Sequence, residues 1–127
     1  MNITKDTLKK LFKEYNKKYF NNELTVCAMH YYNIGDCFGR YISKKDKNGN
    51  VKGNIWITTN VDWTENTLKC VLIHEMIHHY IDTVEKKKFD GLFGHGFFFR
   101  RKMNKINKKF GLNIKTFFSD IKLKNKK

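Results

Sequence analysis

Hydrophobic and polar positions alternate along the chain with two different periods. In residues 4–20, apolar side chains recur three and four residues apart with lysines between them, which predicts an N-terminal amphipathic helix. Runs of β-branched and aromatic residues, separated by polar turns that contain glycine, predict three strands. They fall at residues 24–32, 37–43 and 51–59. Because short turns join consecutive strands, we expect an antiparallel sheet.

The helical period returns twice in the second half of the chain. A strongly apolar helix is expected over residues 63–84, and its start is assigned to the D-x-x-E pattern of Asp62 and Glu65. Residues 85–96 contain three lysines and three glycines and predict a loop. A last amphipathic helix is expected from residue 95 or 96 to residue 110, where a glycine follows.

Together these elements predict an α+β fold with an N-terminal helix, a three-stranded antiparallel sheet, a long central helix and a C-terminal helix. The 127 residues are the length of one domain, and a hydrophobic content of 40% is enough for one core. No repeat or linker divides the sequence. We therefore expect a single domain over residues 1–121, closed by a short segment at 114–121, and a basic C-terminal tail at 122–127.

The residues with the clearest chemistry form an H-E-x-x-H motif in the long central helix, His74-Glu75-Met76-Ile77-His78. Residues four apart share one helix face, so the imidazoles of His74 and His78 can bind one metal ion. Zinc accepts neutral imidazole, and a catalytic site keeps a position open for water. Glu75 lies about 100° round the helix from His74, where it misses the metal but can reach the metal-bound water as a general base. Two hydrogen-bonded core histidines, or metal binding without catalysis, are the alternatives that the motif leaves open.

A third protein ligand is expected downstream of the motif. The candidates are His79, Asp82, Glu85, Asp90 and His95. His95 is favoured, since the glycines on either side of it let the backbone approach closely, and Asp90 and Glu85 stay as alternatives. His79 is rotated off the ligand face of the helix, and Asp82 is placed to orient a ligand histidine.

The three cysteines, Cys27, Cys37 and Cys70, are too far apart for a C-x-x-C pair. Neither a disulfide framework nor a cysteine-based zinc knuckle is therefore expected. Cys70 lies one turn before His74 and is interpreted as a small buried thiol rather than a fourth ligand.

The charge of the chain predicts an anionic partner. There are 26 lysines and arginines against 12 acidic residues, and the formal net charge is +14. Codon bias in an AT-rich genome explains lysine over arginine but not the shortage of acids, so nucleic acid is the expected partner. No apolar stretch is long enough for a membrane span and the lysine-rich N-terminus lacks an apolar signal core, so we expect no membrane partner and a cytoplasmic location.

Several short blocks spread through the chain occur together. They are Leu11-Phe12, Tyr15-Asn16, Tyr19-Phe20-Asn21, Leu24, Gly39, Ile55, Leu72 to His78, Gly94-His95-Gly96, Phe99, Met103, Ile106 and Gly111-Leu112. With these blocks the sequence resembles the SprT-like zinc metalloproteases, which include the Spartan DNA–protein crosslink proteases, and its order of elements matches their minimal zincin-like core. The resemblance implies Zn²⁺ as cofactor, with His74, His78 and His95 as its ligands and Glu75 as the catalytic base.

By this resemblance we expect a zinc endopeptidase that acts on DNA-associated or DNA-crosslinked proteins in the cytoplasm or nucleoid, with Glu75 activating a zinc-bound water. Single-stranded or junction-containing DNA is expected to bind the basic surface. The sequence does not contain the four-cysteine zinc ribbon of many family members, and Phe97 stands where Spartan relatives commonly have proline. The alternatives are a zinc-containing DNA-binding module without protease activity, a general zinc peptidase independent of DNA, and a zinc hydrolase of small amides.

Two sets of residues are candidates for contacts with nucleic acid. The first is a basic face of the last helix, formed by Arg100, Arg101, Lys102, Lys105, Lys108 and Lys109, which predicts phosphate contacts if it is more than a solvated face. The second is the set of strand aromatics Tyr31, Tyr41 and Trp56, which stack on unpaired bases if they are exposed and pack in the core if they are not.

Overall fold

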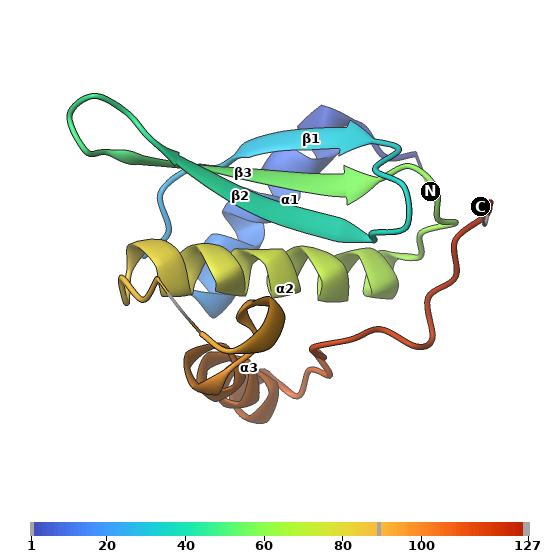
Figure 1. Ribbon diagram of the computed structural model, residues 1–127. Coiled ribbons are helices and arrows are strands. Elements are labelled where there is room, and N and C mark those ends of the chain that lie inside the picture. The colour runs from blue at the N-terminus through green and yellow to red at the C-terminus, as the bar shows by residue number, and fades with distance from the viewer. Residues whose placement is uncertain (1, 89, 126–127) are drawn as a thin grey trace.

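A three-stranded sheet with helices against one of its faces makes up the fold (Figure 1). The computed structural model describes residues 2–88 and 90–125. In chain order the elements are α1 (Lys5–Tyr19), β1 (Ala28–Tyr32), β2 (Gly39–Lys45), β3 (Val51–Thr58), α2 (Glu65–Thr83), the 3-10 turn η1 (Leu92–Gly94) and α3 (Phe97–Phe110). The α+β class is confirmed, and every expected helix and strand is present, although β1 begins four residues later than expected.

The expectation of an antiparallel sheet is wrong for one of its two strand pairs. The strand order is β1-β3-β2, and β3 runs antiparallel to β2 but parallel to β1. β3 takes the centre because Ile55 and Ile57 are fully buried, whereas β2 alternates between half-buried and exposed positions. Residues 33–38, which join β1 to β2, span up to about 20 Å when extended, enough to cross the roughly 10 Å to the far side of β3. β2 is therefore an edge strand.

The start of α2 also differs from the prediction. Thr64 is the N-cap, and its side chain and that of Thr67 satisfy each other's backbone N–H groups in a capping box. Asp62, the predicted start, lies outside the helix with its side chain exposed. Trp63, which lies between Asp62 and Thr64, explains the later start of the helix. Its side chain is buried, and its Nε1 donates a 2.8 Å hydrogen bond to the carbonyl of Thr58. This contact keeps the chain extended up to residue 63.

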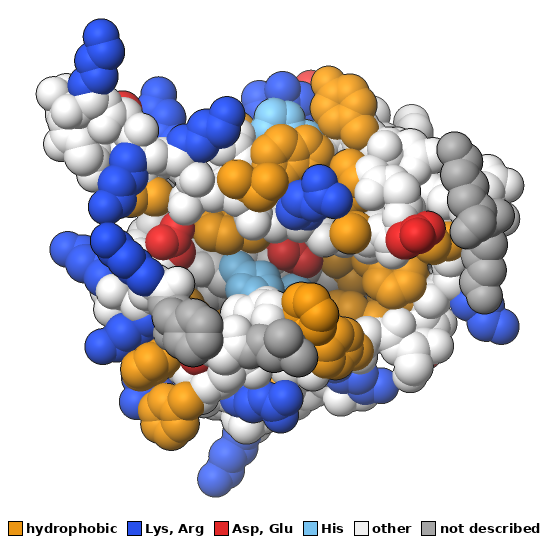
Figure 2. Space-filling view, in the orientation of Figure 1, with side chains coloured by type: hydrophobic (Ala, Val, Ile, Leu, Met, Phe, Trp, Pro, Cys, Tyr) orange, Lys and Arg blue, Asp and Glu red, His pale blue; other side chains and the backbone are white. Residues whose placement is uncertain are grey.

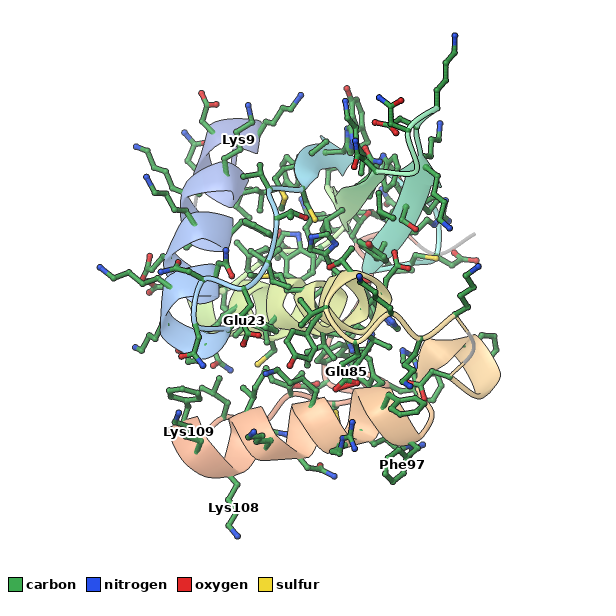
Figure 3. All side chains as sticks on the ribbon, turned by 90° about the vertical axis from the view of Figure 1, so that its left-hand side faces the viewer. Lys9, Glu23, Glu85, Phe97, Lys108 and Lys109 are labelled. Carbon is green, nitrogen blue, oxygen red and sulfur yellow. The ribbon has the colours of Figure 1, made fainter. Side chains whose placement is uncertain are left out.

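α2 forms the centre of the core, since the sheet packs against one side of it and α3 against the other (Figures 1 and 3). It is buried on nearly all sides, which explains its strongly apolar sequence. α3 is amphipathic, as expected, and buries Phe99 and Ile106. None of the helices in the described ranges is long and apolar enough to cross a bilayer.

The segment after α3 runs back beside α2 without forming a helix (Figure 1). Its first part is attached to α3 by Asn107, whose Nδ2 donates to the carbonyl of Ile114 at 2.9 Å while the Ile114 N–H donates to Asn107 Oδ1 at 2.8 Å. This pair fixes where the backbone of residues 114–116 passes over α2.

The predicted tail at 122–127 is described only in part. Leu123 forms an isolated antiparallel bridge with Val61, so the chain at this point contacts the segment that joins β3 to α2. Lys126 and Lys127 lie outside the described residues. The domain boundaries at residues 121 and 122 stay a prediction.

Candidate metal centre

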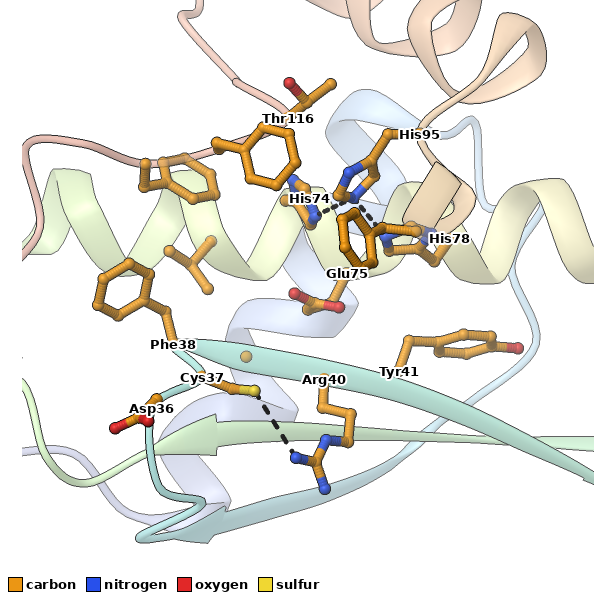
Figure 4. Close-up of a pocket in the computed structure, with 15 residues that line it drawn as sticks. Asp36, Cys37, Phe38, Arg40, Tyr41, His74, Glu75, His78, His95 and Thr116 are labelled. Atoms are coloured by element: carbon orange, nitrogen blue, oxygen red, sulfur yellow. Dashed lines mark hydrogen bonds between the residues drawn. The ribbon is translucent and has the colours of Figure 1, made fainter. Parts of the chain in front are cut away.

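Three histidine side chains meet between α2 and the loop before α3. His74 and His78 project from one face of α2, as their spacing predicts, and His95 comes from the loop between η1 and α3. The Nε2 of His95 lies 3.1 Å from the Nε2 of His74 and 3.2 Å from that of His78 (Figure 4). In residues 2–88 and 90–125, no other group of His, Cys, Asp or Glu side chains is close enough to hold a metal ion.

The donor atoms of this cluster fit a metal ion. Two nitrogens that each lie about 2.05 Å from zinc at a tetrahedral angle are about 3.3 Å apart, close to the two distances from His95, and all three donor atoms lie within 4.8 Å of one another. The Nδ1–H of His74 donates a 2.7 Å hydrogen bond to the carbonyl of Lys115, which leaves its Nε2 with a free lone pair. Burial lowers the pKa of His74 to about 4 and that of His78 to about 3. Both rings are therefore neutral at pH 7, which is the form that binds metals.

The position of His95 depends on how α3 begins. The N-cap residue, Gly96, has no side chain, and the carboxylate of Asp90 takes its place by accepting from the N–H groups of Phe98 at 2.9 Å and Phe99 at 2.6 Å. Gly96 is needed because a Cβ atom there would lie 2.6 Å from the carbonyl oxygen of Asp90. Asp90 therefore holds the loop that carries the histidine, and it is not a ligand.

One aromatic ring, that of Phe99, packs against all three histidines. Phe99 is fully buried, and its ring centroid lies 4.8 Å from that of His74, 4.6 Å from that of His78 and 4.8 Å from that of His95. This apolar wall restricts the rotation of the three imidazoles and keeps water from that side of the cluster.

Glu75 is buried beside the cluster, between the histidines and β2 (Figure 4). Burial raises the pKa of its carboxyl group to about 8. Gly39, the first residue of β2, lies close to this side chain, since a Cβ atom at Gly39 would lie 2.9 Å from Glu75 Oε2 and 3.0 Å from Val71 Cγ1. The glycine therefore allows the edge strand to pass directly over the carboxylate.

A cleft of about 640 Å³ opens over Glu75 and the three histidines. The start of β2 forms one wall, and the other is formed by aromatic residues from η1 and the C-terminal segment; Figure 2 shows histidine and acidic side chains at the floor. Phe93 and Phe117 are 70% and 62% exposed, and their rings meet edge to face with centroids 6.2 Å apart. Phe93 has a left-handed backbone with φ of 57°, uncommon for a residue other than glycine. Two large apolar side chains are thus held at the rim of the cleft.

His79 and Asp82, two of the candidate ligands, belong to a separate network under the sheet. The Nε2–H of His79 donates to the carbonyl of Thr25 at 2.9 Å, and its Nδ1 lies 2.8 Å from the hydroxyl of Tyr41. That hydroxyl donates to Asp82 Oδ2 at 2.8 Å. Asp82 was expected to orient a ligand histidine. It does not, because its carboxylate accepts the hydrogen bond of Tyr41 instead.

The remaining candidates also lie outside the cluster. Glu85 pairs with Arg101 at 3.3 Å. Cys70 is half-buried, burial raises the pKa of its thiol, and it lines a different, smaller hollow. The thiol that lines the cleft is Cys37, whose Sγ lies 3.6 Å from a guanidinium nitrogen of Arg40.

The sequence analysis did not predict the roles of two groups that position the cluster, the carbonyl of Lys115 and the carboxylate of Asp90, which it considered only as a ligand. The carbonyl of Lys115 has no sequence signal, since every residue has a carbonyl group and only the path of the chain selects this one. Asp90 has a weak signal, because aspartate is a preferred helix cap, but it stands six positions before Gly96, too far for any local capping pattern.

Comparison with known proteins identifies the family of this chain. A family model of the SprT-like family matches residues 8–117, and the chain belongs to that family. The resemblance inferred from the sequence blocks is thereby confirmed. A search of curated proteins finds no match. Family membership and the three-histidine cluster together indicate a metallopeptidase-like domain.

Proposed function

We propose that this protein is a zinc-dependent endopeptidase in which His74, His78 and His95 hold the metal and Glu75 is the catalytic base. The observation that carries the proposal is the convergence of three neutral imidazoles beside one buried carboxylate, at the floor of an open cleft. Three protein ligands leave a fourth position free, whereas structural zinc sites use four, usually with cysteine among them. The donor set therefore favours catalysis over a purely structural zinc.

Glu75 carries the proton during hydrolysis. When bound, zinc polarises the scissile carbonyl group and makes water a stronger acid. The Glu75 carboxylate takes a proton from the attacking water as the water oxygen bonds to the carbonyl carbon. Glu75 then donates this proton to the amine nitrogen when the C–N bond breaks. Burial raises the pKa of Glu75 and a nearby cation lowers it, so the group can accept and release a proton near neutral pH.

The substrate backbone lies along β2. This strand has a partner on one side only, and its first residues line the cleft, so an extended peptide can add to its free edge through main-chain hydrogen bonds. Phe93 and Phe117 on the opposite wall offer apolar contacts to the side chains of the peptide. An extended segment is required, which favours unfolded or loosely folded protein substrates.

The finer part of the proposal is that these substrates are proteins bound or crosslinked to DNA. It is supported by the net charge of +14 and by exposed lysines on several elements, of which Figure 3 labels Lys9 on α1 and Lys108 on α3. A zinc peptidase that acts independently of DNA is the alternative.

The test compares the zinc-loaded protein with the Glu75→Gln variant on casein and on a DNA-binding protein, without DNA, with single-stranded DNA and with duplex DNA. Zinc content is measured in parallel. We expect the variant to keep its zinc and to lose cleavage.

Cleavage by zinc-loaded Glu75→Gln would overturn the assignment of the base. Cleavage that requires DNA supports the DNA-associated substrate class, cleavage indifferent to DNA supports a general peptidase, and DNA binding without cleavage by the wild type supports a binding module.

A further inference from the structure

The face of the sheet turned away from the described helices carries aromatic and basic side chains in register. His30 of β1, Trp56 of β3 and Arg40 of β2 are cross-strand neighbours in one row. The rings of His30 and Trp56 are stacked, with centroids 4.5 Å apart and planes inclined by 17°. Tyr32 follows on the same face of β1, 62% exposed, with its ring 6.4 Å from that of His30. These four residues form the sheet platform.

The platform does not belong to the core. The side chains that β1 and β3 bury, such as Met29 and Ile55, point to the opposite face, toward the helices. A hydrogen bond of 3.1 Å between His30 Nε2 and Asn54 Oδ1 holds the imidazole in place beside the indole. A group of aromatic side chains on a solvent-facing sheet, in which Tyr32 is exposed and Trp56 half-buried, is typical of a contact surface.

A hollow of about 330 Å³ lies on the sheet beyond the platform, and lysines line it. Lys44 and Lys52 are directly opposite each other on β2 and β3, an arrangement that costs stability because like charges repel. Lys45 lines the same hollow, and within the described part of the chain none of the three forms an ion pair. The acid at this site, Asp46, accepts two backbone hydrogen bonds of its own turn and attracts Lys52 without forming an ion pair with it, so the repulsion is offset only in part. A negatively charged ligand would relieve the repulsion.

We propose that the sheet platform and the lysine-lined hollow bind single-stranded nucleic acid. Bases stack on the rings of Tyr32 and Trp56, and phosphates of the next few nucleotides lie at Lys44 and Lys52. Stacking requires an unpaired base with a free face, which a duplex does not offer, and it tolerates any sequence because every base has such a face. The lysines add the sequence-independent attraction to the backbone.

The proposal deepens the nucleic-acid part of the proposed function, and it does not depend on peptidase activity. The side chain of Arg40 extends on the opposite side of β2 from Glu75 (Figure 4). Arg40 also lines the cleft, so a strand on the platform lies next to the cleft and on the other face of the sheet from Glu75. Figure 2 shows apolar, histidine and basic side chains together on the sheet side of the molecule, above the cleft.

The basic face of α3 is the competing surface, and the exposed aromatic ring beside it already has an arginine against it. Arg101 is paired with Glu85, and its guanidinium group lies 5.1 Å from the ring centroid of Phe97, the exposed aromatic side chain there. Lys105 and Lys108 are exposed on this helix. They provide a control with the same charge change on another face of the molecule.

The test measures binding of the zinc-loaded full chain to fluorescent oligo(dT), oligo(rU) and a duplex of the same length, by anisotropy at two salt concentrations, with tryptophan quenching as a signature of stacking. The variants are Tyr32→Ala, Tyr32→Phe, Trp56→Ala and the double changes Lys44→Glu/Lys52→Glu and Lys105→Glu/Lys108→Glu. We expect Tyr32→Ala and Lys44→Glu/Lys52→Glu each to weaken binding of single strands by about fivefold or more, and the α3 pair by less than about twofold. Tyr32→Phe should retain binding.

Several outcomes would overturn the proposal. They are a preference for duplex, equal losses in the two double variants, no quenching, or self-association through this face in place of nucleic-acid binding. Tyr32 is so exposed that its replacement should not prevent folding, which circular dichroism checks. Tyr32→Ala should keep the zinc content of the wild type and lose binding of single strands, whereas Glu75→Gln should keep that binding and lose cleavage, so a failure of the platform and a failure of the peptidase assignment give different results. Comparison of oligo(dT) with oligo(rU) distinguishes DNA from RNA.

Discussion

The Nδ1–H of His74 donates a 2.7 Å hydrogen bond to the backbone carbonyl of Lys115, 41 residues further along the chain. This bond sets the tautomer and the orientation of the ring, so that Nε2 faces the other two histidines. The carbonyl is in place because Asn107 pins the neighbouring residue, Ile114, through two hydrogen bonds. The metal site is thus completed by a segment that has no regular secondary structure.

Replacement of Asn107 should therefore weaken metal binding without touching a ligand. We expect Asn107→Ala to lower the affinity for zinc by about 10- to 100-fold, the scale for losing a group that orients a ligand. Asn16→Ala is a matched control, since Asn16 makes the same pair of hydrogen bonds to Leu24, next to α1. Competition with a chromophoric chelator measures both affinities, and equal losses in the two variants would contradict the role of Asn107.

Asp90 should act on the metal through His95. His95→Ala is expected to lower the zinc content by at least about tenfold, and Asp90→Ala should also lower zinc affinity, because the loop loses both hydrogen bonds that hold it to the start of α3. Thr4→Ala is the control, because it removes the cap of another helix, α1. Like the loss of the Asp90 cap, it should lower the free energy of unfolding by about 1 kcal/mol, but it should leave the zinc affinity unchanged. Unchanged zinc affinity in Asp90→Ala would show that the loop is held by other contacts.

Gly39 should be required for catalysis but not for metal binding. In Gly39→Ala the new methyl group would lie 2.9 Å from Glu75 Oε2, so the carboxylate or the edge strand must move. We expect the cleavage rate to fall at least about tenfold, which is the effect expected when a general base is misplaced, while zinc affinity stays within about twofold of the wild type. Gly49→Ala is the control, since nothing lies near its Cβ and its cost is limited to backbone strain in the hairpin. Activity is measured as the initial rate on casein.

The buried carboxylate of Glu75 should make the metal-free protein less stable as the pH rises. Its pKa is raised from 4.5 to about 8, so between these values the folded state holds a proton that the unfolded state has released. Relative to Glu75→Gln, the free energy of unfolding should fall by about 1.4 kcal/mol per pH unit over this range. Urea unfolding of both proteins in a chelator, at several pH values from 5 to 8, measures the difference. A constant difference would mean that Glu75 is solvated.

The lowered pKa values of His74 and His78 act in the opposite direction. Their stabilising contribution is present above pH 6.5 and is lost as the pH falls toward about 4 for His74 and about 3 for His78. Because both histidines are present in the wild type and in Glu75→Gln, this loss cancels in the comparison between the two proteins.

The elements that the sequence predicted well are those whose signals are local. The positions of His74, Glu75 and His78 on one helix follow from the helical period alone, and Gly111 ends α3 in the left-handed conformation that glycine favours. The start of α2 was misplaced because two local patterns compete there, and burial of Trp63 decides in favour of Thr64. A choice of this kind depends on packing, which a short window does not contain.

The amino-acid sequence by itself therefore determined the α+β class, the histidine pair of the central helix with its adjacent carboxylate, His95 as the favoured third histidine, and the SprT-like resemblance. Tertiary structure alone decided that β1 runs parallel to β3, that β2 lies at the edge beside Glu75, and that Asp90 holds a loop while Lys115 supplies a carbonyl. The physical reason is that helix periodicity and capping act over a few residues, whereas strand pairing and support of the metal site join segments far apart, where the packing of the whole chain selects the partners.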